Sequence, residues 1–454
     1  MWLLSNKSKH SFIIMLFDIL IINISIIIAF LLRFQFTLPV FNFQPYMEMS
    51  LWISLGGVFF FNVYHLYSVS ARTRWDDQFY SIIFAVTLNL MLTITITYIS
   101  ANYSFPRSVF IIGGFLQVVL LVSWRYLLWK FTKTALGEQN AIIIGEPVEA
   151  VEIAHRFKEF SESHINVIGI ISNQLQPTES EGGYKVLGLL PDVDKIVEQT
   201  EYDVIVITPS LDAEIKKRII SRCYSAGKEV FLIPDLYEVL LIKANLNLID
   251  DIPVFNIKDS NGDNNQAKRM LDLIIGTIAL VLTLPALVIV AIIIKLDSPG
   301  PVIYKQERVT KGGRVFVLYK FRTMVQDAEQ ETGPVFAVED DQRATRVGRM
   351  LRLSRLDEIP QLFNVLKGDM SLVGPRPERP IFVEQFSKEI DGYDNRHRLK
   401  PGITGIAQIA GKYNTGPREK LVFDLLYAKK NDILVDLQIL LHTIKVLFLR
   451  DKAS

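Results

Sequence analysis

The stretch "LRLSRLDEIPQLFNVLKGDMSLVGPRPE", residues 351–378, concentrates charged side chains and prolines that could act on a phosphate group. Asp357 and Glu358 are adjacent, and Arg352 and Arg376 flank them. A proline on each side of Arg376 restricts the backbone there and favours an extended, rigid conformation. A rigid guanidinium can hold two phosphate oxygens, and phosphoryl transfer depends mainly on positioning and charge neutralisation. The stretch therefore predicts chemistry on a phosphate.

A helix is predicted directly after the two carboxylates, in "DEIPQLFNVLKG". Its apolar stripe and its closing glycine are Leu362, Phe363, Val365, Leu366 and Gly368. A simpler interpretation of Asp357 and Glu358 is that they only cap this helix, because free N–H groups at a helix N-terminus favour anions. Capping explains one carboxylate and leaves the arginines unexplained.

Two further cations belong to "PVIYKQERVTKGGRVFVLYKFRTM", which predicts a two-stranded hairpin that turns at Gly312 and Gly313. Lys320 and Arg322 are two residues apart in its second strand, so they should share one face. Two cations on one face suit a diphosphate. The plainer alternative is a solvated strand edge that resists aggregation.

The first third of the chain contains four long apolar runs, near residues 12–32, 46–67, 79–100 and 109–131. Each reaches the ~20 residues that cross ~30 Å of hydrocarbon as a helix. Basic residues gather before the first run, between the second and third, and after the fourth, so both ends of the bundle are expected in the cytoplasm. Strongly polar residues within the runs are few, among them Asp18. We interpret the bundle as an anchor or assembly platform.

The pattern changes after Gly137 to short apolar strands alternating with helices, which predicts a parallel, doubly wound α/β sheet. The turn after the first strand reads "GEPVEA". It has one glycine, and its proline removes an N–H group, whereas a dinucleotide site needs a glycine-rich turn there. We therefore expect residues 138–262 to form a Rossmann-like but degenerate domain with a structural or regulatory role.

Residues 272–295 form a fifth apolar run that is long enough to cross a membrane, but two features argue against crossing. Pro285 lies near the midpoint, where it removes a helix hydrogen bond. Both flanks are basic, and a spanning helix would place them on opposite sides of the membrane. A re-entrant helix that breaks at Pro285 and returns to the same side satisfies both observations. A kinked spanning helix is the alternative.

The C-terminal motifs resemble those of the bacterial sugar transferases, which are polyprenyl-phosphate phosphoglycosyltransferases of the monotopic superfamily. The resemblance rests on "KFRTM", "LDEIPQLFNVLKGDMSLVGPRPE", "KPGITGIAQ" and "LVDLQILLHTIKVL". The apolar start and the Rossmann-like middle resemble the family's long form. The organisation that the resemblance implies is a four-helix transmembrane bundle over residues 1–137, a Rossmann-like (CoA-binding-like, degenerate) domain over 138–262, and an α/β catalytic domain over 263–454 with the re-entrant helix 272–295.

The resemblance implies transfer of a sugar 1-phosphate from a UDP-sugar to polyprenyl (undecaprenyl) phosphate, with release of UMP and with Mg²⁺ as cofactor. Carried over, Asp357 is the nucleophile of a covalent phosphosugar intermediate and a ligand of Mg²⁺, and Glu358 is its partner. Arg352 and Arg376 match positions that contact the nucleotide diphosphate, and Pro285 matches the break in the membrane helix. A carboxylate near its reference pKa of ~3.9 is ionised at neutral pH and needs no base to attack phosphorus.

The resemblance also implies a location in the bacterial cytoplasmic (inner) membrane, multi-pass, with the catalytic domain facing the cytoplasm. The expected role is to initiate exopolysaccharide, capsule or O-antigen-type glycans from glucose or galactose. A homodimer through the N-terminal two-thirds is also predicted. Two departures, Ile406 where the family often has Trp and Gly416 where it often has an acidic residue, concern sugar or nucleotide selection. A net charge of +1 argues against nucleic acid as a partner.

Two other functions are compatible with the sequence. One is a non-enzymatic membrane protein that assembles or regulates the polysaccharide machinery, against which the intact Asp357–Glu358 pair argues. The other is a metal-dependent glycosyltransferase that releases UDP. Its metal would need an acidic cluster, for which Glu339, Asp340 and Asp341 are available. Release of UMP or UDP separates the transferases.

Every predicted catalytic motif follows residue 260. We therefore expect a chain that lacks residues 1–260 to keep detectable catalysis, because the "GEPVEA" turn indicates that the middle domain supplies no reactive group. Release of UMP from a UDP-sugar measures this. Complete loss of activity in a folded, membrane-bound truncation would contradict it.

Overall fold

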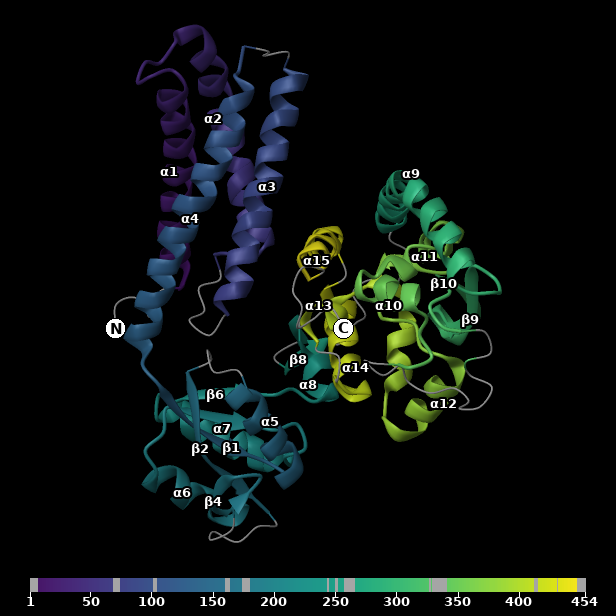
Figure 1. The fold of residues 1–454 in the computed structure, drawn as a ribbon. Coiled ribbons are helices and arrows are strands. Elements are labelled where there is room, and N and C mark those ends of the chain that lie inside the picture. Colours follow the sequence, from purple (N-terminus) through teal and green to yellow (C-terminus); the bar gives the residue numbers. More distant parts are fainter. Residues whose placement is uncertain are drawn as a thin grey trace. The chain divides into compact units, whose positions relative to one another are not determined.

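The structure is a computed structural model of the 454-residue chain. It describes residues 7–67, 74–100, 104–159, 164–173, 180–242, 245–249, 252–256, 266–325, 328, 341–411, 415–430 and 432–446. The chain divides into two compact units, Met1–Pro234 and Asp235–Ser454. The first unit holds the apolar bundle and a parallel sheet, and the second holds the predicted catalytic residues (Figure 1).

Four long helices open the first unit and pack side by side as a bundle (Figure 1). They are α1 (Lys7–Arg33), α2 (Val40–Val63), α3 (Trp75–Ile99) and α4 (Arg107–Leu136). α1, α3 and α4 are long and apolar enough to cross a membrane. α2 has 24 residues and carries Gln44, Pro45 and Glu48 near its start. The four predicted apolar helices are confirmed, and they are those of a membrane protein.

A buried ion pair joins two of these helices. Asp18 in α1 pairs with Arg125 in α4, and both side chains are almost completely buried. Arg125 also donates a hydrogen bond to the Leu66 carbonyl oxygen (2.5 Å), and its guanidinium lies over the Tyr67 ring. Charges at membrane depth are costly unless they are paired. Asp18 therefore serves as a contact between helices, which agrees with an anchoring role for the bundle.

The sheet of the first unit has six strands in the order β3-β4-β2-β1-β5-β6. Its elements are β1 (Gln139–Ile144), α5 (Pro147–Glu159), β2 (Ile165–Ser172), β3 (Ser180–Glu181), β4 (Tyr184–Leu189), η2 (Leu190–Asp192), α6 (Val193–Gln199), β5 (Val204–Ile207), α7 (Ala213–Ser225) and β6 (Glu229–Leu232). All strand pairs except β3–β4 are parallel. Alternate residues of β1 and β5 enter two apolar clusters, one on each face. The predicted doubly wound sheet is confirmed.

The second unit combines one long helix with short strands and helices. Its elements are α8 (Leu236–Leu241), β7 (Asn245–Ile249), β8 (Ile252–Asn256), α9 (Gln266–Asp297), β9 (Ile303–Val309), η3 (Lys311–Gly313), β10 (Val315–Phe321), α10 (Arg346–Leu353), η4 (Leu356–Glu358), α11 (Gln361–Lys367), β11 (Ser371–Val373), α12 (Pro380–Glu389), η5 (Tyr393–Arg398), β12 (Gly402–Thr404), α13 (Ile406–Ala410), α14 (Pro417–Lys430) and α15 (Ile433–Val446). β9 and β10 form the predicted hairpin, and Gly312 and Gly313 take positive φ angles at its turn. β7 pairs with β8, and β11 pairs with β12 in parallel.

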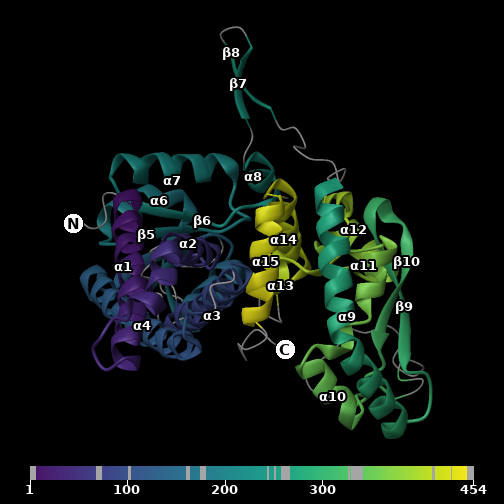
Figure 2. The ribbon, with the colours of Figure 1, turned by 90° about the horizontal axis from the view of Figure 1, so that it is seen from above.

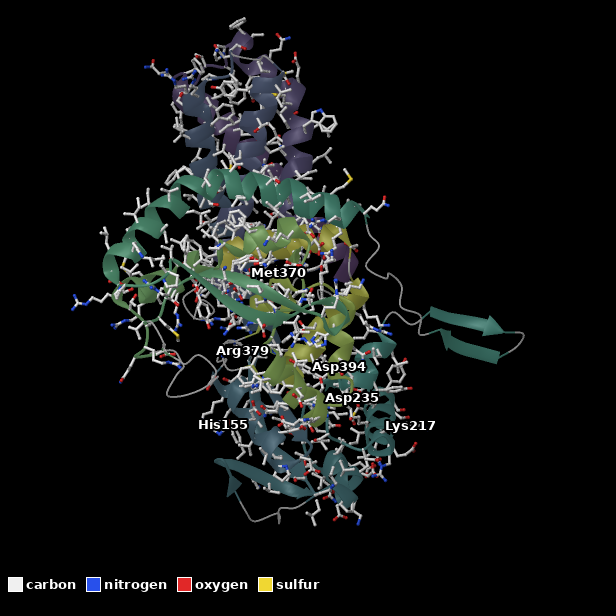
Figure 3. The ribbon with its side chains drawn as sticks, turned by 90° about the vertical axis from the view of Figure 1, so that its right-hand side faces the viewer. His155, Lys217, Asp235, Met370, Arg379 and Asp394 are labelled. Carbon is white, nitrogen blue, oxygen red and sulfur yellow. The ribbon has the colours of Figure 1, made fainter. Side chains whose placement is uncertain are left out.

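α9 is one continuous helix, whereas the sequence predicted a break at Pro285. Figures 2 and 3 show that the helix bends along its course. Two local features favour a bend: Pro285 itself, and the Thr283 hydroxyl, which donates to the Ala279 carbonyl oxygen (2.7 Å). The helix continues through the proline because a kink relieves the steric clash while neighbouring turns keep their hydrogen bonds.

One face of α9 packs on the second unit over the whole length of the helix. The first half contacts α11, and the second half contacts α10. The opposite face is apolar, and only 6% of the most apolar window of the helix, with all its faces counted, is buried. Its exposed side chains include Ile274, Ile278, Leu282, Ile289 and Leu296. α9 therefore runs along the domain to which it belongs.

A buried polar network ties α9 to the C-terminal helices. Lys268 Nζ donates to Asp436 Oδ2 (2.6 Å), to the Tyr427 hydroxyl (2.8 Å) and to the Val373 carbonyl oxygen (3.1 Å). The Tyr427 hydroxyl donates to Asp436 Oδ1 (2.5 Å). Removing one partner of such a buried pair typically costs about 3–5 kcal/mol of stability. This network therefore holds α9, β11, α14 and α15 together.

α8 belongs to the second unit, although it precedes the boundary predicted at residue 262. Val239 of α8 is completely buried in a cluster with Phe382, Phe386 and Leu425. A truncation that removes residues 1–260 would remove Val239 and expose this cluster. The cut that preserves the unit lies after Pro234.

We predict that a chain beginning at Asp235 is more stable than a chain beginning at residue 261, and that it keeps more of the expected UMP-releasing activity. The reason is the retained packing of Val239, whose loss leaves a cavity costing about 2 kcal/mol or more. Thermal unfolding in detergent compares the two truncations. A Val239→Ala variant of the longer truncation is the matched control and should have an intermediate melting temperature. Equal melting temperatures for all three would contradict the prediction.

Candidate active site

The two adjacent carboxylates lie in a 3₁₀ turn, η4, ahead of α11. α11 begins at Gln361, later than predicted, and Gly368 closes it in a left-handed conformation, as predicted. No side chain makes a capping hydrogen bond at the start of η4 or of α11. Helix capping therefore does not explain Asp357 and Glu358.

Arg355, the residue before this turn, has φ 53° and ψ 18°. That left-handed conformation is uncommon for a residue with a side chain and stores strain unless the surroundings hold it. Strained residues of this kind cluster at active sites. The left-handed conformation of Arg355 therefore sets the direction of the chain as it enters η4, and with it the positions of Asp357 and Glu358.

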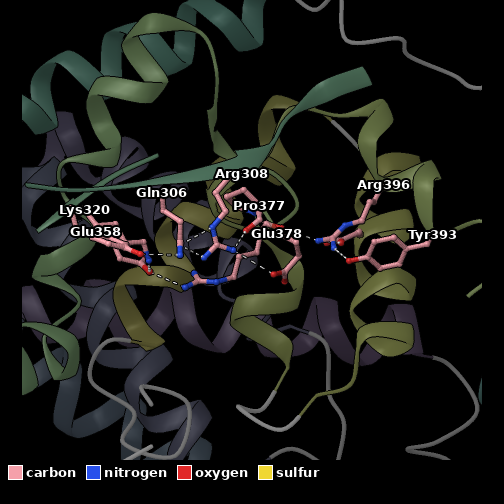
Figure 4. Close-up of polar contacts among 11 residues, drawn as sticks. Gln306, Arg308, Lys320, Glu358, Pro377, Glu378, Tyr393 and Arg396 are labelled. Atoms are coloured by element: carbon pink, nitrogen blue, oxygen red, sulfur yellow. Dashed lines mark hydrogen bonds and ion pairs between the residues drawn. The ribbon is translucent and has the colours of Figure 1, made fainter. Parts of the chain in front are cut away.

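Glu358 holds two cations that come from different elements (Figure 4). Its Oε1 accepts hydrogen bonds from Lys320 Nζ on β10 (2.8 Å) and from Arg376 Nη2 in the loop after β11 (2.9 Å). Burial by itself would raise the pKa of Glu358, but Arg376 and Lys320 outweigh it and hold that pKa well below its usual range. Glu358 in turn raises the pKa of Arg376. Glu358 therefore stays ionised between these two cations.

Asp357 is buried beside this cluster, and no residue that the structure describes donates a hydrogen bond to its carboxylate. Burial raises the pKa of Asp357 above its ordinary value, and Lys320, Arg376 and Arg352 oppose that rise. The expectation of an ordinary pKa is therefore wrong, because desolvation disfavours the charged form. The surrounding cations are what favour an ionised Asp357.

Arg322 and Arg352, the two predicted substrate-binding residues besides Lys320 and Arg376, have different partners in the structure. Arg322 lies just beyond the end of β10, is buried, and donates to the carbonyl oxygens of Ser298 (2.8 Å) and Pro299 (2.6 Å) after α9. It does not face Glu358 with Lys320, because the strand ends at Phe321 and its alternation ends there. Arg352 donates from Nε to the Thr323 hydroxyl (3.0 Å) and lowers the pKa of Asp357.

Two arginines that the sequence did not single out, the partly buried Arg308 and the buried Arg396, contact the loop that carries Arg376 (both are labelled in Figure 4). Arg308 Nη1 donates to the Pro377 carbonyl oxygen (3.0 Å), and Arg396 Nη2 donates to the Arg376 carbonyl oxygen (2.9 Å). Burial lowers the pKa of Arg308 to about 10, partly offset by Glu378. Neither arginine had a local sequence signal, because both contacts join segments far apart in the chain.

The "KPGITG" motif supports the same loop. Gly402 N–H donates to the Pro375 carbonyl oxygen (2.9 Å), and a Cβ at Gly402 would lie 2.1 Å from the Gly374 nitrogen. The two backbones approach too closely for any side chain. Of the two departures, Ile406 packs against the core of this unit. Gly416 precedes α14, and its N–H donates to the Glu419 carboxylate (3.3 Å).

The residues that could hold Mg²⁺ are few. No group of three or more His, Cys, Asp or Glu side chains suited to a metal occurs within the described residues. Glu339 and Asp340 lie outside those residues, and Asp341 is paired with Arg343 (2.6 Å). Mg²⁺ commonly binds one or two carboxylates together with substrate phosphates. The Asp357 carboxylate, which no described group engages, fits a Mg²⁺ shared with a diphosphate.

The crevice between the carboxyl ends of β1 and β5 is the place where doubly wound folds bind dinucleotides. Here the Glu149 carboxylate accepts hydrogen bonds from the Ser210 hydroxyl (2.5 Å) and the Ser210 N–H (3.3 Å) across that crevice. A Cβ at Gly145 would lie 1.9 Å from the Thr208 hydroxyl, so this glycine serves strand packing. A carboxylate at this point repels phosphate, which supports the prediction of a degenerate site.

We predict that Lys320→Met moves the acidic limb of the pH–activity profile to higher pH. Lys320 is the strongest of the groups that lower the pKa of Asp357, so its loss raises that pKa and protonates the carboxylate at a pH where the wild type remains ionised. The measurement is kcat/KM for UMP release against pH. Lys305→Met, an exposed lysine on the same hairpin, is the control and should leave the limb in place. An unchanged limb in Lys320→Met would contradict the prediction.

Comparison with protein families identifies both parts of the chain. Residues 263–450 match the family described as bacterial sugar transferase, and residues 62–234 match the family described as CoA-binding domain. The first match contains every residue of the candidate active site. The second covers helices α3 and α4 of the bundle and the doubly wound sheet.

Curated proteins include long relatives of this chain. The UDP-glucose:undecaprenyl-phosphate glucose-1-phosphate transferase of Klebsiella pneumoniae is 31% identical over 79% of each chain. The enzyme of the same name from Xanthomonas campestris pv. campestris is 31% identical over 73% of this chain and 71% of the relative. The UDP-N-acetylgalactosamine-undecaprenyl-phosphate N-acetylgalactosaminephosphotransferase of Aeromonas hydrophila is 41% identical over 51% of this chain and 55% of the relative. This chain belongs to the bacterial sugar transferase family.

Proposed function

We propose that the protein transfers a hexose 1-phosphate from a UDP-sugar to undecaprenyl phosphate and releases UMP. The observation that carries this proposal is the pair of adjacent carboxylates with opposite environments. Glu358 is held by Lys320 and Arg376, whereas Asp357 is buried and accepts no hydrogen bond from the described residues. Glu358 thus holds the cations, and Asp357 is available to react. A free carboxylate beside bound cations suits nucleophilic attack on phosphorus, and the chain belongs to the bacterial sugar transferase family.

In the first step an Asp357 oxygen attacks the phosphorus that bears the sugar. A bond forms between that oxygen and phosphorus, and the bond from phosphorus to the bridging oxygen breaks. The electron pair stays with the bridging oxygen, which leaves as part of UMP. In the second step an oxygen of undecaprenyl phosphate attacks the same phosphorus and releases the Asp357 carboxylate. No oxidant, reductant or further reactant is required.

The cations of the site reduce the electrostatic repulsion between the attacking carboxylate and the diphosphate. Arg376 keeps 41% of its side chain exposed while it pairs with Glu358, so its free edge can bind phosphate oxygens. Lys320 and Arg352 add positive charge around Asp357. A Mg²⁺ bound by Asp357 and the diphosphate would neutralise charge on the phosphate oxygens. Arg322 is assigned to the end of α9 and not to the substrate.

The membrane position of α9 is part of the proposal. Both halves of α9 pack on the catalytic unit, and its outer face is apolar, which supports a helix that enters one leaflet and returns. A straight spanning helix would carry half of these packing contacts into the bilayer. The site would then lie at the cytoplasmic surface of the inner membrane, where the phosphate of a polyprenyl lipid resides.

The cellular role is the start of an exopolysaccharide, capsule or O-antigen-type glycan. Glucose and galactose are the first sugars to test, together with N-acetylgalactosamine, because the relatives are named for glucose and N-acetylgalactosamine. A homodimer through the N-terminal two-thirds is part of the same proposal. A transferase that releases UDP is the competing function, and product analysis by chromatography separates UMP from UDP.

We predict that Asp357→Asn abolishes both the covalent adduct and turnover. Asparagine keeps the shape of the side chain but lacks the ionised oxygen that forms the bond. The measurement is mass spectrometry of the enzyme incubated with UDP-sugar and Mg²⁺ but without lipid acceptor. The wild type should gain the mass of a sugar phosphate and release UMP before any acceptor is added. Glu358→Gln should also cripple turnover, because it releases Lys320 and Arg376.

Asp391→Asn is the matched control, since Asp391 is an exposed aspartate of the same unit outside the site, and it should behave as wild type. If Asp357 only capped a helix, its substitution would cost about 0.5–2 kcal/mol of stability and leave the chemistry intact. An Asp357→Asn variant that still gains the sugar-phosphate mass would end the nucleophile assignment.

A second prediction concerns α9: both of its flanks face the cytoplasm. Asn264, the natural choice on one flank, lies outside the described residues, and Thr310 on the other is buried. The exposed positions Ala267 and Arg314 are therefore replaced by cysteine, one at a time, in a Cys223→Ser background. An impermeant maleimide should label neither in intact spheroplasts and both after permeabilisation. Labelling of one flank alone in intact spheroplasts would show a spanning helix.

A further inference from the structure

The loop that carries Arg376 is held at four consecutive carbonyl oxygens. Pro375 accepts a hydrogen bond from Gly402 N–H (2.9 Å), and Glu378 accepts one from Val309 N–H (3.0 Å). Between them, the Arg376 carbonyl oxygen accepts from Arg396 Nη2 (2.9 Å) and the Pro377 carbonyl oxygen accepts from Arg308 Nη1 (3.0 Å). The donors come from β9, η5 and β12, so three distant segments meet on one short loop.

Arg396 is the donor that holds Arg376 itself, and its own position is strongly determined. Its side chain is 4% exposed and forms an ion pair with Asp424 of α14, whose side chain is 3% exposed, at 2.9 Å. It also donates to the Tyr393 hydroxyl, and its guanidinium lies over the Tyr393 ring (Figure 4). A buried, fully charged donor makes a stronger hydrogen bond to a carbonyl oxygen than a neutral one does.

The Arg376 side chain is held by Glu358 at Nη2 and 41% of it is exposed, so side-chain packing fixes its direction only in part. The direction of its guanidinium therefore depends on where its main chain is held. The carbonyl oxygen of Arg376 accepts a hydrogen bond from Arg396, and Arg396 forms an ion pair with Asp424. Neither Arg396 nor Asp424 has a described contact with Asp357 or Glu358.

We propose that Arg396 and Asp424 are a positioning pair for the transfer reaction. They hold the main chain of Arg376 so that its guanidinium spans Glu358 and the diphosphate of the UDP-sugar. Misplacement of a phosphate-binding group by about 1 Å costs up to about 100-fold in rate. This inference rests on the proposed role of Arg376 as the diphosphate-binding residue.

The test is a double-mutant cycle on the full-length protein in detergent, read as kcat/KM for UMP release from a UDP-sugar. Asp424→Asn alone should lower kcat/KM by on the order of 10- to 100-fold. In an Arg376→Ala background the same substitution should cost less than about threefold, because no guanidinium is left to position. The loss in Asp424→Asn should include a raised KM for the UDP-sugar. A variant that is merely less stable loses kcat and keeps its KM.

Asp436→Asn is the matched control. Asp436 is also a buried aspartate paired with a buried cation, Lys268, but it has no described contact with the Arg376 loop. It should lower the melting temperature and leave the KM for the UDP-sugar unchanged. If Asp424→Asn does not fold, Arg396→Lys takes its place in the cycle. Lysine keeps a cation near Asp424 but has a single nitrogen in place of the planar guanidinium, whose Nη1 donates to Tyr393 and whose Nη2 donates to the Arg376 carbonyl oxygen.

The outcomes separate the two proposals. If Arg376→Ala leaves kcat/KM at the wild-type value, the role of Arg376 in the proposed function is wrong, and the positioning pair falls with it. If Arg376→Ala is impaired and Asp424→Asn costs the same factor in both backgrounds, the positioning inference alone is overturned. Strong coupling in the cycle, with a raised KM in Asp424→Asn and an unchanged KM in the Asp436→Asn control, supports it.

Discussion

The ion cluster of Glu358 with Lys320 and Arg376 is the interaction on which the site depends. A buried carboxylate is unfavourable unless it is paired, and here the partners Lys320 and Arg376 come from a strand and from a loop 56 residues apart in sequence. The pairing draws β10, η4 and the loop after β11 to one point. It also occupies Glu358, and among the described residues its neighbour Asp357 has no hydrogen-bond or ion-pair partner of its own. Adjacent carboxylates thereby receive different environments and can take different roles.

Charge alone would not hold this arrangement, because the cations are on flexible side chains. The prolines around Arg376 restrict its backbone, and glycines at positions 374 and 402 let the β11–β12 pair approach closely behind it. Hydrogen bonds from β9, η5 and β12 then saturate the carbonyl oxygens of the loop. The result is a partly exposed arginine on a main chain that is held in place, which is the combination that binding of a diphosphate requires.

α9 places an apolar surface next to this chemistry. Its inner face packs on α10 and α11, the two helices that flank η4 in sequence, and its outer face presents apolar side chains. The elements that carry Asp357 are therefore separated from the apolar surface only by one layer of helices. An acceptor with a water-exposed phosphate and a long apolar chain matches such an arrangement, because both parts are met within one domain.

Local patterns in the sequence were sufficient for the elements. Long apolar runs predicted the four N-terminal helices, and the alternation of short strands with helices predicted the doubly wound sheet. Two adjacent glycines predicted the β9–β10 turn. These features depend on residues close together in the chain. The spacing of apolar residues and the residue types at turns therefore predict them directly. The adjacent pair Asp357 and Glu358 was visible for the same reason.

The tertiary structure decided which charged groups meet. Arg322, two residues from Lys320, turned to the end of α9 because β10 had ended, and Arg308 and Arg396 reached the active loop from distant segments. The raised pKa of Asp357 depends on burial, which no local pattern reports. α9 continues through Pro285 because its inner face packs on both sides of the bend. Long-range packing and desolvation are properties of the folded chain, and so they could be known only from it.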